Sequence, residues 1–240
     1  MILAAGLGTR LKPLTDRIPK ALVPVGGIPL IDRVLGRLHE AGVTEAVVNV
    51  HHLADQLEEH LKSREWGLTV RISDERHELL DTGGGLRHAK GLFTNDGKPI
   101  LIHNVDILSN ADLRKFYHSH DSDGASLLVS NRQTNRYLMF DADGRLCGWT
   151  NLATGAVRTP YPNLKVENMR LLAFSGIHCF SPKLFPWMDS FPERFSIIDF
   201  YLSVCDKADI RCYEQPGLKL LDVGKLNTLH EADRWVGTAD

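Results

Sequence analysis

The first half of the chain alternates between short apolar runs and segments with the period of a helix, which limits the possible folds more than any other feature. Apolar side chains at 30, 31, 34, 35, 38 and 41 recur at helical spacing and stop before a glycine. Strands that alternate with helices form βαβ units, whose parallel strands share one sheet. The pattern predicts strands at 2–5, 46–50, 68–72, 100–103 and 125–130, and helices at 30–41, 54–61, 82–89 and 111–118.

The rhythm changes near residue 135. Apolar runs at 137–140, 146–150 and 171–180 are separated by turn-forming residues, which favours antiparallel strands. The rest of the chain predicts helices at 182–188 and 197–207, a strand at 210–214, a short run at 219–223 and a helix at 225–236. We therefore expect an α/β fold: a Rossmann-like three-layer sandwich with a mostly parallel central sheet and a small antiparallel elaboration on the substrate side.

Composition excludes several classes of protein. The net charge is −2 at pH 7, so no bulk positive field is available to hold nucleic acid. No run approaches 18 apolar residues, which argues against a membrane span. The four cysteines stand at unrelated spacings, a pattern typical of reduced thiols rather than of disulfides or a zinc site. These observations favour a cytoplasmic protein.

The turn after the first apolar run predicts an anion site. It reads G-L-G-T-R over residues 6–10, and Pro19-Lys20 follows ten residues later. Successive main-chain N–H groups in such a turn form a nest for phosphate oxygens. Arg10 adds a forked cation that suits bidentate phosphate binding, and Lys20 adds a point charge on a flexible stem.

Two common phosphate-binding motifs do not fit this turn. In the dinucleotide motif G-x-G-x-x-G the third glycine is replaced here by Leu11, and the second predicted strand is followed by His51 and His52 instead of an acid. The Walker motif G-x-x-x-x-G-K-[ST] is absent from the sequence. The turn therefore belongs to another class of phosphate site.

Residues 3–11 read L-A-A-G-L-G-T-R-L, and with the later P-K they resemble the signature of the sugar nucleotidyltransferases. Further segments match the family in the same order: L-D-T-G-G-G at 80–85, L-I-H-N-V-D at 101–106, F-S-G at 174–176 and L-D-V-G at 221–224. The triple glycine, the F-S-G-I segment and the compact length most resemble the branch that uses UTP and N-acetylmuramate 1-phosphate. The resemblance implies one domain, with about 1–130 as the nucleotide-binding half and about 131–240 as the sugar-phosphate-binding half.

In the reaction that the resemblance implies, a phosphate oxygen of a sugar 1-phosphate attacks the α-phosphorus of a nucleoside triphosphate and pyrophosphate leaves. The nucleophile is already ionised at neutral pH, so positioning and positive charge replace a general base. The resemblance gives catalytic roles to Arg10, Lys20 and Asp106. It implies nucleotide contacts from Leu3, Ala4, Ala5, Gly6, Gly8, Thr9, Arg10, Lys20, Thr82, Gly83, Asn104 and Asp106, and sugar-phosphate contacts from Lys20, Gly84, Asn151, Glu167, Gly176 and Asp222.

Asp106 and Asp222 each follow an apolar run and are expected at one edge of the sheet. Two converging carboxylates are hard-oxygen ligands, so we expect them to hold Mg²⁺ together with substrate phosphates. Val105 departs from the family, which has glycine there, and leaves Asp106 in its role only if the valine side chain points into the sheet.

Other functions remain open on the sequence alone. A guanylyltransferase or cytidylyltransferase acting on another sugar or alcohol phosphate would share the first turn. A non-catalytic subunit that binds nucleotide sugars is a third possibility, although it is expected to lose Arg10, Lys20, Asp106 or Asp222, which are all present. The expected partners are a nucleoside triphosphate and a sugar 1-phosphate, with no nucleic acid or membrane, and the expected assembly is a monomer or small homo-oligomer.

Overall fold

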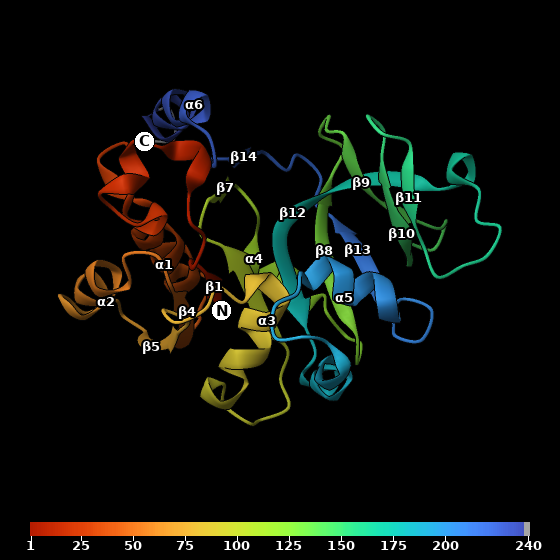
Figure 1. Cartoon of the computed structure of the whole chain (residues 1–240), viewed down its shortest axis with the longest axis horizontal. Helices are drawn as coiled ribbons and strands as arrows, with labels where there is room; N and C mark the ends of the chain where they lie inside the picture. Colours follow the sequence, from red (N-terminus) through yellow and green to blue (C-terminus); the bar gives the residue numbers. More distant parts are fainter. Residues whose placement is uncertain (238–240) are drawn as a thin grey trace.

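The computed structural model describes residues 1–237, in which ten strands form one sheet (Figure 1). Its main path runs β11-β10-β9-β12-β6-β1-β4-β5, and β8 pairs with both β12 and β13. These strands are β1 Ile2–Leu3, β4 Glu45–Val50, β5 Thr69–Asp74, β6 Ile100–Asn104, β8 Ala125–Ser130, β9 Arg136–Phe140, β10 Leu146–Asn151, β11 Ala156–Arg158, β12 Arg170–Phe180 and β13 Ile210–Glu214.

The nucleotide-side part of the sheet is parallel, as the alternating pattern predicts. β1 pairs in parallel with β4 and β6, and β4 pairs in parallel with β5. The antiparallel strands β9, β10 and β11 extend the same sheet at its other end. The predicted fold class is confirmed.

One long strand joins the two parts. β12 pairs with β9 over residues 170–172 and with β6 over residues 177–180, while its other edge pairs with β8. Gly176 interrupts the register with β8 and has a φ of +72°, a conformation that side chains other than glycine rarely adopt. A Cβ at this position would also lie 2.8 Å from Nδ2 of Asn104.

Helices cover both faces and complete the three layers. The helices are α1 Leu30–Glu40, α2 Ala54–Lys62, α3 Asp81–His88, α4 Leu113–His118, α5 Ile197–Val204 and α6 Leu226–Gly237. Helices α1, α2, α4 and α6 share one buried apolar cluster with the sheet, and α3 and α5 share the other. Within residues 1–237, no helix has the length and apolar character that crossing a membrane requires.

Several elements differ from the sequence prediction. The strands β7 Ile107–Ser109 and β14 Leu220–Asp222 pair in a small antiparallel ribbon, of which only the second was expected as an apolar run. A second ribbon joins β2 Pro24–Val25 to β3 Ile28–Pro29. The predicted helix at 182–188 is a 3₁₀ helix, Pro182–Ser190, with Pro186 inside it, where proline removes a donor that an α-helix would use. Further 3₁₀ turns lie at Thr9–Leu11, Leu14–Asp16, Lys20–Leu22, Ala89–Leu92 and Val166–Asn168.

The triple glycine of α3 lets this helix approach the segment before α5 closely, as Figure 1 shows. The main-chain N–H groups of Gly83 and Gly84 donate to the carbonyl oxygen of Phe195, at 2.9 and 3.1 Å. A Cβ at position 83 would lie 2.4 Å from the Phe195 ring, and one at position 84 would lie 2.3 Å from the carbonyl oxygen of Glu193. Real Cβ contacts are not this short, so a larger residue must displace the backbone.

We expect Gly84→Ala to lower the free energy of unfolding by about 1–3 kcal/mol, because the added methyl overpacks the contact with Glu193. Gly36→Ala is the matched control: Gly36 lies in the interior of α1 with no atom near the position of a Cβ. There the alanine is expected to raise the free energy of unfolding by about 0.5–1 kcal/mol. Urea unfolding of both variants measures the difference, and equal changes would contradict the packing argument.

Candidate active site

The turn that follows β1 presents a row of unused main-chain donors. Among the residues that the structure describes, no acceptor is bonded to the N–H groups of residues 6–10. Gly8 has a φ of +62°, and its carbonyl oxygen accepts a hydrogen bond from Oγ1 of Thr15 at 2.8 Å. This geometry matches the anion nest that the sequence predicts.

Lys20 and Asp106 form an ion pair close to this turn. The amino group of Lys20, at the start of a 3₁₀ helix, donates to Oδ2 of Asp106, which follows β6. Their side chains are 12% and 14% exposed, so water reaches both groups but screens them only partly. The structure thus places a cation and a carboxylate, predicted for phosphate and Mg²⁺ respectively, at one point.

Asp222 lies beside Asp106 because β14 pairs with β7. Asp222 is opposite Ile107 in this ribbon, and the N–H of Val223 donates to the carbonyl oxygen of Asp106 at 2.9 Å. Oδ1 of Asp222 accepts the N–H of Gly224 at 2.8 Å, and a Cβ at Gly224 would lie 2.6 Å from both this oxygen and Nη2 of Arg10. Arg10 and Asp222 therefore flank the same glycine.

The departure at Val105 does not reach the site. Val105 is 3% exposed, belongs to the apolar core and donates its N–H to the carbonyl oxygen of Leu3. The side chain of Asp106 therefore lies on the side of Lys20. This arrangement meets the condition stated for Val105, whose side chain had to point into the sheet. Asn104 lies next to Gly176, so these two predicted site residues are also neighbours.

Two residues that the sequence analysis missed hold the first turn in place. Oδ1 of Asn49, on β4, accepts the N–H groups of Ala4 and Ala5 at 2.6 and 3.3 Å. Nδ2 of Asn49 donates to Oε1 of Glu75 at 2.8 Å, and Oε2 of Glu75 accepts the N–H of Leu80 just before α3. Burial raises the pKa of the Glu75 carboxyl, and the hydrogen bonds from Asn49 and Leu80 act in the opposite direction.

The structure gives Thr82, Gly83 and Gly84, which are predicted to contact the substrates, a packing role. Oγ1 of Thr82 accepts the N–H of Ile197 at 2.9 Å, and the N–H groups of Gly83 and Gly84 are bonded to Phe195. These groups are therefore occupied within the protein. The ligand contacts expected of the three residues stay predictions.

A cavity of about 700 Å³ begins at Arg10 and Asp222 and continues over the antiparallel strands. Three aromatic side chains, Tyr137, Trp149 and Phe174, line it. Most ligand pockets combine such an apolar wall with a few placed polar groups. Its other lining residues are Arg132, Thr134, Asn135, Arg136, Leu138, Arg158, Ser196, Ile198, Asp199 and Lys225.

Of the six residues predicted to contact the sugar phosphate, only Asp222 lines this cavity; the others are Lys20, Gly84, Asn151, Glu167 and Gly176. Asn151 ends β10 and accepts the N–H of Ala153 in the turn to β11. Glu167 is exposed in the 3₁₀ turn Val166–Asn168. Neither residue lines the cavity that contains Arg10 and Asp222, and the sugar-phosphate contacts expected of both stay predictions.

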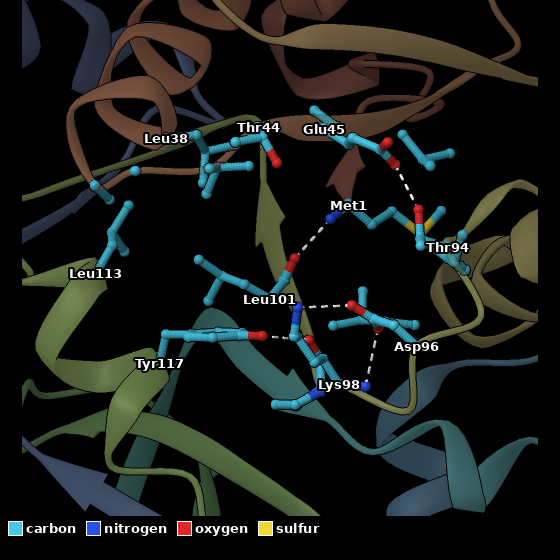
Figure 2. A pocket seen from close by; sticks show the side chains of 18 of the residues that line it. Met1, Leu38, Thr44, Glu45, Thr94, Asp96, Lys98, Leu101, Leu113 and Tyr117 are labelled. Carbon is cyan, nitrogen blue, oxygen red and sulfur yellow. Dashed lines mark hydrogen bonds and ion pairs between the residues drawn. The ribbon is translucent and has the colours of Figure 1, made fainter.

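A second cavity, of about 530 Å³, lies at the opposite edge of the parallel strands (Figure 2). It continues the line of β1 between β4 and β6, next to Met1, whose amino group donates to the carbonyl oxygen of Leu101 at 2.6 Å. None of the predicted site residues lines it. Ligands of open α/β sheets bind outside the carboxyl ends of the strands, so the first cavity is the better candidate.

The carboxylates of the site fit Mg²⁺ better than a metal with an all-protein ligand shell. Within the part of the chain that the structure describes, no three His, Cys, Asp or Glu side chains form a metal-binding group. Asp106 and Asp222 carry hard-oxygen donors and are neighbours along the ribbon of β7 and β14. Mg²⁺ is commonly held by one or two carboxylates, with water and substrate phosphates as its other ligands.

Comparisons with known proteins agree with this site. A family model described as nucleotidyl transferase matches residues 1–140. N-acetylmuramate alpha-1-phosphate uridylyltransferase of Caulobacter vibrioides is 55% identical over 109 residues, which is 44% of this chain and 44% of that protein. The protein of the same name from Neisseria meningitidis serogroup B is 33% identical over 191 residues, 79% of this chain and 78% of that protein.

Relatives with another name match as well. Mannose-1-phosphate guanyltransferase beta-B of Xenopus laevis is 32% identical over 189 residues, 76% of this chain and 49% of that protein. The match thus spans about half the length of the Xenopus protein and somewhat less than half of the Caulobacter protein.

Solved structures support the fold. The crystal structure of HddC from Yersinia pseudotuberculosis has a TM-score of 0.76 at 23% identity, over 98% of this chain and 97% of that one. The family model covers more than half of the chain, and the Neisseria relative exceeds 30% identity over most of it. The chain therefore belongs to the nucleotidyl transferase family.

Proposed function

We propose that this protein transfers UMP from UTP to a sugar 1-phosphate, with N-acetylmuramate 1-phosphate as the preferred sugar, to give a UDP-sugar and pyrophosphate. The observation that carries the proposal is the convergence of Arg10, Lys20, Asp106 and Asp222 at the donor-rich turn after β1. The choice of UTP and this sugar is supported by the names of the Caulobacter and Neisseria relatives.

The chain's own residues would act by positioning and charge. The N–H groups of residues 6–10, with Arg10, hold the β- and γ-phosphates and favour the departure of pyrophosphate. Lys20 bridges the α-phosphate and the incoming sugar phosphate, which lowers the repulsion between two anions. Its ion pair with Asp106 keeps the flexible lysine at this point. When bound by Asp106 and Asp222, Mg²⁺ would neutralise further phosphate charge.

A guanylyltransferase is the second candidate. The Xenopus relative, which covers three quarters of this chain, is named a mannose-1-phosphate guanyltransferase, so a purine nucleotide and an uncharged sugar are the main competing pair. A non-catalytic binding subunit is disfavoured because all four charged residues are present and adjacent. The four free thiols suit a reducing compartment, and we place the reaction in the cytoplasm.

A matrix of nucleotides and sugar phosphates tests the proposal. We expect the highest kcat/KM for UTP with N-acetylmuramate 1-phosphate when UTP, GTP and CTP are each paired with that sugar, N-acetylglucosamine 1-phosphate and mannose 1-phosphate. Release of pyrophosphate in the presence of Mg²⁺ is the measurement. Faster turnover with GTP and mannose 1-phosphate would favour the second candidate, and no turnover with any pair would refute both.

Arg10→Ala and Lys20→Ala are expected to fail in different ways. Loss of Arg10 removes a contact to the triphosphate tail, so the KM for the nucleotide and for pyrophosphate in reverse should rise about tenfold or more. Loss of Lys20 should lower kcat by about 10²-fold even with both substrates saturating. Lys12→Ala is the control, since Lys12 is exposed and paired with Asp16. Equal small effects in all three variants would make Arg10 and Lys20 ordinary surface cations.

Asp106→Asn and Asp222→Asn test the shared metal site. Each change removes a charge at constant size, so the fold should survive while kcat falls by at least about 10²-fold, roughly 2.7 kcal/mol of barrier. The Mg²⁺ concentration for half-maximal activity should rise in both variants. The double variant should be little worse than the worse single variant, because one lost ligand already spoils a shared site. Near-normal Mg²⁺ dependence in Asp222→Asn would leave Asp222 as a turn residue only.

A further inference from the structure

The cavity that begins at Arg10 and Asp222 has a wall of positive charge. Five cationic and two acidic side chains line it, whereas the whole chain has a net charge of −2. The cationic residues are Arg10, Arg132, Arg136, Arg158 and Lys225, and the acidic ones are Asp199 and Asp222. Cations gathered in one cavity favour anionic ligands there.

Two of these cations already have a neighbouring carboxylate in the protein. Arg158 forms an ion pair with Asp199 at 2.8 Å, and its guanidinium lies 5.8 Å from the centre of the Trp149 ring. Arg10 lies next to Asp222, at the end of the cavity where the phosphates are proposed to bind. Arg158 and Arg10 therefore do not account for the other cations of the cavity.

Among the described residues, Arg132 and Lys225 have no acidic partner. No carboxylate within residues 1–237 lies at ion-pair distance from either side chain. Nη2 of Arg132 donates to the carbonyl oxygen of Phe174 at 3.1 Å, which holds the guanidinium against β12 and leaves other N–H groups for a ligand. Arg132 and Lys225 also line an adjoining hollow of about 670 Å³, so they face the same open space.

We infer that the sugar 1-phosphate bound in this cavity carries a carboxylate, and that Arg132, assisted by Lys225, is the residue that selects for it. This inference rests on the proposed sugar-1-phosphate transfer. A guanidinium binds a carboxylate through two parallel hydrogen bonds, and a nearby ammonium adds a point charge. An uncharged hexose phosphate would leave both cations without a partner. The lactyl ether of N-acetylmuramate supplies a carboxylate that N-acetylglucosamine lacks.

The test compares two sugars that differ in this group. For wild-type protein and Arg132→Gln, kcat/KM is measured for N-acetylmuramate 1-phosphate and for N-acetylglucosamine 1-phosphate, with the fastest nucleotide held at saturation. We expect the ratio of the two values to fall by about 10- to 100-fold in Arg132→Gln, mainly through the KM of the acidic sugar, because a charged hydrogen-bonded contact is lost. Arg132→Lys keeps the positive charge but loses the two parallel donors of the guanidinium, and it should give an intermediate ratio.

Arg136→Gln is the matched control. It removes the same charge from the same wall, at an exposed residue whose guanidinium has no hydrogen bond to the protein among the described residues. Arg132 is exposed as well, but Phe174 holds its guanidinium in place, whereas an anion would have to order that of Arg136, so we expect the ratio to stay within about threefold of wild type. Thermal unfolding of each variant shows whether the fold is intact. Lys225→Gln should lower the ratio in the same direction as Arg132→Gln.

The outcomes separate this inference from the proposed function. If no sugar 1-phosphate is a substrate with any nucleotide, the proposed function is wrong and the inference falls with it. If sugars are substrates but wild-type protein shows no preference for the acidic one, or Arg132→Gln lowers both kcat/KM values equally, only the inference is overturned. A fall in Arg136→Gln as large as that in Arg132→Gln would assign the preference to overall charge and overturn the role of Arg132.

Discussion

The side chain of Asn49 connects the two segments on which the nucleotide side of the site depends. Its oxygen accepts the N–H groups of Ala4 and Ala5, and its amide donates to Glu75, which in turn accepts the N–H of Leu80. Asn49 and Glu75 are each 3% exposed. In such surroundings an unpaired polar group costs the full loss of its hydration, so these bonds strongly favour one arrangement of the turn. The N–H groups of Ala4 and Ala5 are thus bonded within the protein, whereas among the described residues no acceptor is bonded to those of residues 6–10.

The same region also joins helices α3 and α5, which share one apolar cluster. Helix α3 begins next to Leu80 and contacts Phe195 through Gly83 and Gly84, while Oγ1 of Thr82 accepts the N–H of Ile197, the first residue of α5. A glycine run inside a helix is unfavourable by intrinsic propensity, and this cost is accepted where two segments must approach closely. The motif that identifies the family therefore has a structural task here, whatever contacts it makes with a nucleotide.

The sequence was sufficient for features that depend on neighbours along the chain. Helical spacing located α1 and α2, apolar runs located β4 and β8, and Lys20 and Asp106, which were expected at one site, lie together. The sequence was insufficient for features whose interacting residues are far apart along the chain. The ribbon of β7 and β14 has three residues per strand, too few for a periodic signal, and Asn49 and Glu75 resemble ordinary polar residues of a strand. Asn151 and Glu167 lie in or next to turns outside the cavity lining, and their expected contacts with the sugar phosphate stay predictions.

Charge is arranged differently at the two ends of the site, and this difference bears on how an anion enters it. At the inner end Lys20 is paired with Asp106 and Arg10 lies beside Asp222, so a phosphate must compete with the protein's own carboxylates. Such a contact is favourable only when the geometry is good, because partly buried charges give up hydration to form it. At the outer end Arg132 and Lys225 are exposed and solvated, so an anion there competes with water alone. Contacts at the inner end therefore form only with well-placed phosphates, while at the outer end the guanidinium that Phe174 holds in place favours a sugar that carries a carboxylate.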